Sequence, residues 1–338
     1  MMRARGFLSP ATAAITALLS LPLVSCATAP STTLAKFKPV PAERIDAESL
    51  ERRYRTAESR FVEVDGVKVH YRDEGAGPTI VLLHGSFGSL RTFDVMANEL
   101  RRNFRVVRYD QPPAGLSGSV PKDFSGTMED FLAHFLDRVG VQQAALLGTS
   151  SGGIIAYRFA ARYPQRVRAL VLSNVPPSAP VDNAGAARRA PEDIQRKLAL
   201  CTAAGEPRST ACWQVFLQFS FVRQSKLTAA LVREYTDLNR KPDSQHMSSM
   251  TPLMRDDTAV KRFLGDVRAP TLLVWGTEDY VLPLSTMQTL ASRLTGTTVE
   301  QVSLPNVAHY PPLEAPREVT AATKKFLARL DAAGITGP

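Results

Sequence analysis

The stretch that decides the fold runs from Ala144 to Arg162 and reads AALLGTSSGGIIAYRFAAR. It begins as a short apolar run, passes through Gly148-Thr149-Ser150-Ser151-Gly152, and continues with helical periodicity. A G-x-S-x-G pattern between a strand and a helix indicates a tight turn, because only small residues on either side let the turn hold Ser150 exposed above a sheet. The simpler alternative is a glycine- and serine-rich helix start in which Ser150 is only an N-cap.

Short runs of β-branched and apolar residues recur on both sides of this stretch. Phe61–Val64 and Val67–Tyr71, separated by Asp65-Gly66, predict an antiparallel hairpin. Further strands are predicted at 79–83, 105–109, 143–147, 169–173, 270–275 and 298–304, and helices near 92–102, 128–139, 153–162, 285–294 and 316–330. Near-continuous apolar strands that alternate with helices favour an α/β fold, with a mostly parallel sheet covered by helices on both faces.

The rest of the chain divides around this sheet. Residues 175–264 contain no convincing strand and predict a helical cap inserted after the sixth strand, so residues 58–174 and 265–338 form the core. Residues 26–57 predict a tether rich in Ser, Thr and Pro that ends in a short surface helix. Residues 1–25 predict an export signal.

The composition is that of a globular protein. Of 338 residues, 44% are apolar and 22% are charged, which excludes a mostly disordered chain. The 41 Lys and Arg residues against 32 Asp and Glu give a net charge of +9. Because the basic residues occur at most in pairs, such as Arg52-Arg53, we expect a solvated surface and no nucleic-acid partner.

More patterns fall at the ends of the predicted strands. The loop after the third strand reads His84-Gly85-Ser86-Phe87-Gly88, and residues 109–117 read YDQPPAGLS, with Pro113 where glycine is usual. Residues 275–283 read WGTEDYVLP, and Asn306-Val307-Ala308-His309 is followed by Glu314-Ala315-Pro316. Together with the turn around Ser150, and in this order, these patterns resemble the α/β-hydrolase family over essentially residues 61–330.

The resemblance implies a catalytic triad of Ser150, Asp279 and His309, which is the family's chain order. A serine hydroxyl needs a base to remove its proton during attack, and His309 is the candidate base and the later acid. Asp279 would hold the imidazole in the right tautomer and stabilise its charged form. The backbone N–H groups of Ser151 and of Ser86, or alternatively of Phe87, would form the oxyanion hole.

Other residues compete for these roles. Glu278 is a rival for the acid and Ser151 for the nucleophile, although the glycine spacing favours Ser150. Some family members carry the acid at the end of the strand before the cap, where this chain has Asn174 and not a carboxylate. The histidines at 70, 84, 134 and 246 are expected to be structural or surface residues. No histidine pair has metal-ligand spacing, so we expect neither a metal nor a cofactor.

The nucleophile restricts the reaction. Relatives that open epoxides or cleave carbon–halogen bonds use Asp there, so Ser150 implies acyl transfer to water from a small-molecule carboxylic ester or lactone. The alternatives are a C–C or amide bond cleaved by the same triad, or a ligand-sensing protein with a vestigial site. Apolar side chains of the loop after the third strand and of the cap are candidates for the substrate pocket. They are Phe87, Trp213, Phe216, Phe219, Phe221 and Met247. Plain packing of the cap against the core would explain these apolar residues as well.

The amino terminus resembles that of a bacterial lipoprotein. Two arginines precede an apolar stretch from Ala11 to Val24, which is too short for a comfortable membrane span. Leu23-Val24-Ser25-Cys26 resembles a lipobox, so Cys26 is expected to carry acyl chains that anchor the protein in a membrane. Ala27 in the next position implies the periplasmic face of the outer membrane. A plain secretory signal and an uncleaved anchor are the alternatives.

The other two cysteines are Cys201 and Cys212. An oxidising compartment permits a disulfide between them, and the alternative is a pair of unbonded buried thiols. We expect the disulfide, which would stabilise the cap by about 2–3 kcal/mol.

Overall fold

The computed structural model describes residues 36–121, 123–177, 186, 188–242 and 257–335. The predicted export signal, Cys26 and Met247 lie outside these residues. Phe37–Pro338 forms one compact unit, to which the following description refers.

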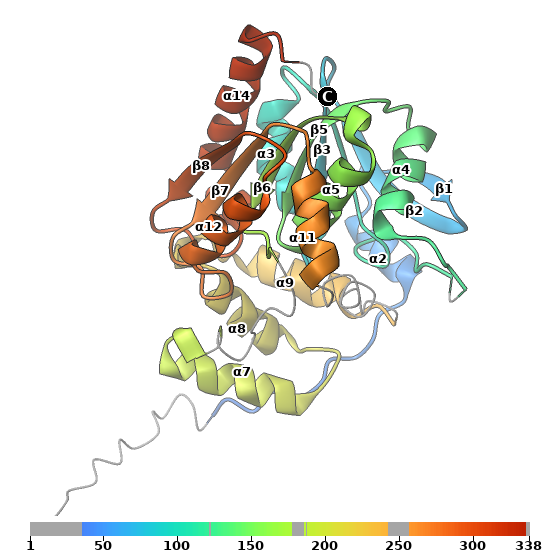
Figure 1. Cartoon of the computed structure of the whole chain (residues 1–338). Coiled ribbons are helices and arrows are strands. Elements are labelled where there is room, and N and C mark those ends of the chain that lie inside the picture. The colour runs from blue at the N-terminus through green and yellow to red at the C-terminus, as the bar shows by residue number, and fades with distance from the viewer. Residues whose placement is uncertain (1–35, 122, 178–185, 187, 243–256, 336–338) are drawn as a thin grey trace, which may run out of the picture. The chain divides into compact units, whose positions relative to one another are not determined.

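An eight-stranded sheet forms the centre of this unit (Figure 1). Its strands are β1 (Arg60–Val64), β2 (Val67–Glu74), β3 (Thr79–Leu83), β4 (Arg105–Tyr109), β5 (Ala144–Thr149), β6 (Val167–Ser173), β7 (Thr271–Gly276) and β8 (Val299–Leu304). They lie in the order β1-β2-β4-β3-β5-β6-β7-β8. The pairs β1–β2 and β2–β4 are antiparallel and all other pairs are parallel, which confirms the predicted α/β fold with its hairpin and mostly parallel sheet.

Helices cover both faces of the sheet, because alternate strand residues point to opposite sides. On one face Ile80 and Leu82 share a buried cluster with residues of α3 (Asp94–Leu100) and α14 (Pro316–Ala332). On the other face Val81 and Leu83 pack with residues of α4 (Met128–Arg138), α5 (Ser151–Arg162) and α12 (Leu284–Arg293). Burial on both faces explains why the central strands β3, β5 and β7 are nearly continuous apolar runs.

A helical insertion follows β6, as predicted. It contains α7 (Glu192–Ala204), α8 (Thr210–Ser220) and α9 (Ala229–Leu238), in which α8 packs against both neighbours (Figure 1). The starts of two of these helices are encoded locally, since the side chains of Ser209 and Thr228 accept hydrogen bonds from the first turns of α8 and α9.

One helix of the stretch predicted as cap belongs elsewhere. α11 (Asp257–Asp266) packs against α5 on the sheet, and its Val260 and Leu264 share the buried cluster of Ile154. The predicted boundary at residue 264 is therefore wrong for this helix. The apolar stripe of an amphipathic helix shows that one face is buried, but not against which partner.

The short helix predicted before the core is α2 (Ala47–Tyr54). It is tied to α9, because Arg53 Nη1 and the Tyr54 hydroxyl donate to the Asp237 carboxylate at 2.6 and 2.8 Å. Leu50, in the middle of α2, is fully buried. The helix thus connects the segment that enters the core with the cap.

Candidate active site

Ser150 occupies the turn between β5 and α5. Its φ of 49° lies in the left-handed region, which an L-residue adopts only where its surroundings enforce it. A Cβ on Gly148 would lie 2.5 Å from the Gly153 Cα, and a Cβ on Gly152 would lie 2.3 Å from the His84 backbone oxygen. Only glycine fits at these positions, which explains the G-x-S-x-G pattern. The Ser150 side chain makes no capping hydrogen bond to α5, so the N-cap alternative does not describe it.

Three side chains that are far apart in the sequence meet at this turn. The His309 Nε2 atom lies 3.1 Å from Ser150 Oγ, and its Nδ1 atom lies 2.7 Å from Asp279 Oδ2. Asp279 follows β7 and His309 follows β8, so adjacent parallel strands deliver both side chains to the same edge of the sheet. Both residues are buried, and the Val281 N–H donates to Asp279 Oδ1 at 2.7 Å.

The rival residues take other positions. Glu278 is exposed, and its carboxylate accepts a hydrogen bond from the neighbouring Thr277 hydroxyl at 3.2 Å. Ser151 is buried at the start of α5, where its hydroxyl accepts from Ser86 Oγ at 3.0 Å. Of the two serines in the turn, Ser150 is the one within hydrogen-bond distance of His309.

The loop after β3 lies against Ser150. A Cβ on Gly85 would be 3.0 Å from the Ser150 Cβ, so a larger residue there would have to shift the loop or the serine by a few tenths of an ångström. The Tyr310 hydroxyl donates to the Ser86 carbonyl at 3.1 Å, and the Asn239 amide donates to the Phe87 carbonyl at 3.0 Å. These two hydrogen bonds fix the peptide planes of the loop. Neither Tyr310 nor Asn239 carried a signal in the sequence, because their acceptors are backbone atoms of a distant loop.

His84 is a structural residue, as expected. Its Nδ1 atom lies 2.8 Å from the Gly85 carbonyl oxygen, and its Nε2 atom accepts the Gln111 N–H at 2.9 Å. Burial lowers the pKa of His84, which favours the neutral ring that this pair of contacts requires. His84 therefore connects the loop after β3 with the loop after β4.

A second Ser–His–Asp series lies next to β2. The His70 Nε2 atom is 2.9 Å from Ser59 Oγ, and its Nδ1 atom is 2.7 Å from Asp110 Oδ2. Burial would raise the pKa of Asp110, but the charge and hydrogen bond of His70 and the backbone N–H donors lower it to about 2. The carboxylate also accepts the N–H groups of Leu90 and Leu116, so it holds two loops together. His70, expected to be an ordinary packed histidine, thus belongs to a structural network.

Glu314 connects the histidine loop with the cap. Its fully buried carboxylate accepts the N–H groups of Val222, Arg223 and Ala308, the first at 2.8 Å and the last at 2.6 Å. The His309 N–H donates to the Ser220 carbonyl at 3.1 Å, which adds a further link to the end of α8. The sequence marked Glu314 only as part of a pattern. Since Val222 precedes it by 92 residues, no local signal could show what it binds.

Comparison with known proteins identifies the family. Residues 78–316, most of the chain, match the family model described as alpha/beta hydrolase fold. The chain belongs to the α/β-hydrolase family. A 2-hydroxy-6-oxononadienedioate/2-hydroxy-6-oxononatrienedioate hydrolase of Paraburkholderia phymatum is 30% identical over 247 residues, which cover 68% of this chain and 82% of that protein. A 2-hydroxy-6-oxo-6-phenylhexa-2,4-dienoate hydrolase of Comamonas testosteroni is 26% identical over 229 residues, 64% of this chain and 76% of that protein.

Solved structures of other proteins are similar to this chain as well. A membrane phospholipase A, described as a bacterial virulence factor, superposes with a TM-score of 0.68 at 26% identity, over 84% of this chain and 92% of that one. An enol-lactonase from Burkholderia xenovorans has a TM-score of 0.63 at 22% identity, over 80% of this chain and all of that one, and shows the shared fold alone. The chain is thus a hydrolase of a fold that serves several scissile bonds.

Aromatic side chains of this hydrolase fill the space between the cap and the loop after β3. The Phe87 ring lies 5.4 Å from the rings of both Trp213 and Phe216. Tyr310 joins the same buried cluster, and the Arg208 guanidinium lies 5.2 Å from the Phe87 ring centre. Three of the predicted pocket residues therefore meet beside Ser86, in a mainly aromatic environment.

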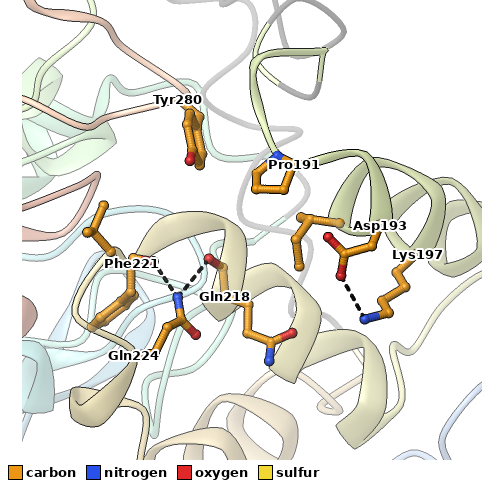
Figure 2. A pocket seen from close by; sticks show the side chains of 9 residues that line it. Pro191, Asp193, Lys197, Gln218, Phe221, Gln224 and Tyr280 are labelled. Carbon is orange, nitrogen blue, oxygen red and sulfur yellow. Dashed lines mark hydrogen bonds and ion pairs between the residues drawn. The ribbon is translucent and has the colours of Figure 1, made fainter. Parts of the chain in front are cut away.

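The other pocket candidates lie apart from this cluster. Phe219 stacks on Tyr280 at 5.9 Å and packs with Ala186 and Ala190. A pocket of about 310 Å³ opens between α7, the end of α8 and Tyr280 (Figure 2). It is lined by Pro191, Asp193, Ile194, Lys197, Gln218, Phe221, Val222, Gln224 and Tyr280. Phe221 is the one pocket candidate on this wall, which also carries the Asp193–Lys197 ion pair.

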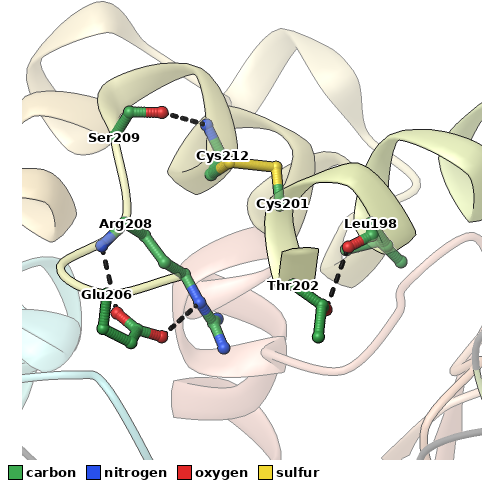
Figure 3. The surroundings of a disulfide bond; sticks show 7 residues. All are labelled: Leu198, Cys201, Thr202, Glu206, Arg208, Ser209 and Cys212. Carbon is green, nitrogen blue, oxygen red and sulfur yellow. Dashed lines mark hydrogen bonds and ion pairs between the residues drawn. A yellow bond between two sulfur atoms is a disulfide. The ribbon is translucent and has the colours of Figure 1, made fainter. Parts of the chain in front are cut away.

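A disulfide bond joins the two helices that form the wall. Cys201 of α7 is bonded to Cys212 of α8, and both residues are buried (Figure 3). Ser209 caps α8 at the Cys212 N–H, one turn from the bond. The disulfide closes a short loop at the start of α8, whereas His309 lies near the end of that helix. It therefore restrains the helix that carries Trp213 and Phe216.

Within the described ranges, no three His, Cys, Asp or Glu side chains come together in a way that could hold a metal ion. Among the helices of that same part of the chain, none combines the length and the hydropathy needed to span a membrane.

Proposed function

We propose that this hydrolase cleaves a carboxylic ester, either open-chain or a lactone, through an acyl-enzyme on Ser150. The observation that carries the proposal is the hydrogen-bonded series from Ser150 Oγ through His309 to Asp279, built on a strained turn. A serine beside a buried imidazole whose other nitrogen faces a carboxylate is the arrangement that activates a hydroxyl at neutral pH.

The reaction has two halves. His309 Nε2 takes the Ser150 proton while Oγ attacks the acyl carbon, and the C–O bond to the alcohol then breaks as His309 protonates the leaving oxygen. In the second half, water loses a proton to His309 and attacks the acyl-serine, which releases the acid and restores the Ser150 hydroxyl. One water is consumed for one acid and one alcohol, which for a lactone are two groups of the same product. Asp279 keeps the Nδ1 proton of His309 in place and stabilises the imidazolium.

We assign the oxyanion hole to the backbone N–H groups of Ser151 and Ser86, with Phe87 as the alternative to Ser86. The N–H of Ser151 is in the first turn of α5, where backbone donors lack acceptors within the helix. The hydroxyl contact between Ser86 and Ser151 supports the pairing, because it brings the two backbones together beside Ser150. Such donors contribute about 10²–10³ in rate each. The aromatic side chains of Phe87, Trp213 and Phe216 favour an apolar group on the substrate.

A specific observation favours a second candidate reaction. The curated relatives at 26–30% identity are named as hydrolases of 2-hydroxy-6-oxo dienoates and dienedioates. In such a compound the bond to be hydrolysed joins two carbons, so the released fragment takes its proton on carbon and not on oxygen. The same serine, histidine and aspartate could serve both reactions, and the leaving group decides between them.

The deciding experiment uses the fragment from Ala27 onward. We expect a fluorophosphonate to label Ser150, p-nitrophenyl esters from acetate to octanoate to turn over, and Ser150→Ala to abolish both. Turnover of a 2-hydroxy-6-oxo dienoate with no ester turnover would replace the ester proposal by the C–C reaction. Labelling without turnover of any substrate would point to a ligand-sensing protein, and an active Ser150→Ala protein would refute the catalytic assignment.

We also propose that the protein is exported and anchored by acyl chains on Cys26, at the periplasmic face of the outer membrane. The proposal is supported by the apolar stretch before Leu23-Val24-Ser25-Cys26 and by Ala27. We expect labelled palmitate to enter the full-length chain in a bacterial host, and Cys26→Ser to lose the label and leave the membrane fraction. An unlabelled protein that fractionates with the soluble periplasm would contradict the anchor.

A further inference from the structure

We propose that Asn174 is a positioning residue, which orients the triad carboxylate of Asp279 by donating a hydrogen bond to it. The Asn174 Nδ2 atom lies 2.6 Å from Asp279 Oδ2, the same oxygen that faces His309 Nδ1 at 2.7 Å. The inference rests on the proposed function, because it assigns Asn174 a part in the catalytic geometry of Ser150.

The contacts of Asn174 define which way its amide points. Its Oδ1 atom accepts the Gly276 N–H at 3.1 Å, and a backbone N–H can be satisfied only by an acceptor. The NH₂ group must therefore face Asp279, which as an ionised carboxylate requires a donor. The flipped amide would place oxygen against oxygen and NH₂ against N–H. Oxygen and nitrogen are thus assigned by their partners.

The backbone of Asn174 is as fixed as its side chain. The residue follows β6, is fully buried, and donates its own N–H to the Val274 carbonyl at 3.3 Å. Its φ of 47° lies in the left-handed region, which Asn and Gly tolerate better than other residues. One side chain thus connects the end of β6, the end of β7 and the acid loop.

The Asp279 carboxylate is held on both oxygens. Oδ1 accepts the Val281 N–H at 2.7 Å, while Oδ2 accepts from Asn174 and faces His309. Without the amide, the plane of the carboxylate could turn about the Cβ–Cγ bond, and Oδ2 would no longer be aimed at His309. Hydrogen bonds to an ionised acceptor are about twice as strong as neutral ones, so the amide contributes directly to this orientation.

Two ionisable groups lie near the Asp279 carboxylate, and the neutral donor that orients it is the amide of Asn174. His309 faces it through Nδ1, and Tyr310 lies near enough to feel its charge. Burial raises the pKa of Tyr310 and the Asp279 charge raises it further, so the phenol stays neutral. Asn174 holds, as an amide, the position where other members of the fold carry the acid, and its role follows from the donor that it offers.

The test compares Asn174→Gly with Asn174→Asp. Glycine keeps the left-handed backbone and removes the side-chain contacts to Asp279, Gly276 and the Ala308 carbonyl. We expect the rate constant for fluorophosphonate labelling of Ser150 to fall by about tenfold to a hundredfold, with kcat lowered to the same extent and KM changed less than about twofold, because no substrate contact is lost. Labelling within twofold of wild type would overturn the inference.

Asn174→Asp tests the contact through the pH profile of labelling, which should stay unchanged if Asn174 is purely structural. Two carboxyl groups 2.6 Å apart hold one proton between them, so the protonated pair still offers a donor to Asp279. We expect labelling close to wild type at about pH 6 and a loss of at least tenfold toward pH 9, a limb that the wild-type profile lacks. A profile parallel to wild type would overturn the contact. Asn103→Asp, the same change on an exposed turn, is the charge-matched control.

The labelling rate separates this inference from the proposed function. It reports the basicity of His309 and the reactivity of Ser150 toward phosphorus, and needs no turnover of an ester. A wild-type protein that labels at Ser150 but hydrolyses no ester would count against the ester proposal, and the variants would still decide on Asn174. If Asn174→Gly does not fold, the pH profile of Asn174→Asp decides alone.

Discussion

Replacing Glu314 by Gln tests the connection between the cap and the histidine loop. The buried carboxylate accepts three backbone N–H groups, two from the segment after α8 and one from Ala308. An amide oxygen can face only one of these sides. The NH₂ group then opposes the N–H on the other side, so at least one charge-assisted hydrogen bond is lost and one buried donor is left unsatisfied.

The expected cost follows from these contacts. A hydrogen bond to an ionised group contributes about 1.5–3 kcal/mol, and an unsatisfied buried donor costs about 1–3 kcal/mol. We expect Glu314→Gln to lower the free energy of unfolding by about 3 kcal/mol, measured by urea denaturation at pH 7. Because Ala308 precedes His309, we also expect kcat to fall by about tenfold, the equivalent of 1.4 kcal/mol of transition-state stabilisation.

Glu318→Gln is the matched control. Its carboxylate, 45% exposed, pairs with the side chain of Arg223, the same residue whose N–H binds Glu314. The pKa of Glu318 is lowered by this partner, but an exposed ion pair contributes at most about 1 kcal/mol. Equal losses of stability in the two variants, or a loss below about 1 kcal/mol in Glu314→Gln, would refute the reasoning that backbone donors of both loops depend on one carboxylate.

Three further outcomes are expected. Tyr310→Phe removes the donor to the Ser86 carbonyl. We expect kcat/KM to fall about fivefold, for a net loss of about 1 kcal/mol, while the melting temperature stays nearly unchanged. Unchanged kinetics would show that the loop holds its shape without Tyr310. Because folding lowers the pKa of Asp110 from 3.8 to about 2, its contribution of about 2 kcal/mol is present above pH 4 and is lost as the pH falls toward 2. The stability difference between wild type and Asp110→Asn should therefore shrink on acidification, and a constant difference would contradict the shift. Reducing the Cys201–Cys212 bond should lower the stability of the cap by about 2–3 kcal/mol, measured as a lower urea midpoint in dithiothreitol. The midpoint of a Cys201→Ser/Cys212→Ser protein should not respond to the reductant.

Much of the fold could be predicted because its signals are local. The apolar runs that became β3 to β8 can be recognised from their own residues, and the turn at Ser150 requires glycines within three residues on either side. The triad of Ser150, Asp279 and His309 was expected from the resemblance to the α/β-hydrolase family. In the structure each of the three follows a strand, and parallel strands end at one edge of the sheet. The assignment of α11 to the cap was wrong, because the choice between two apolar partners is not encoded in the helix itself.

Local chemistry thus decided the elements, the turn at Ser150 and the order of the candidate site residues along the chain. Long-range packing decided what holds them: Asn174 on Asp279, Glu314 on the end of α8, Tyr310 on the Ser86 carbonyl, and His70 on Asp110. In these contacts an ordinary polar side chain meets a partner or a backbone atom from a distant part of the sequence. Such contacts leave no periodicity or motif, because a buried hydrogen bond constrains geometry in space and not spacing along the chain.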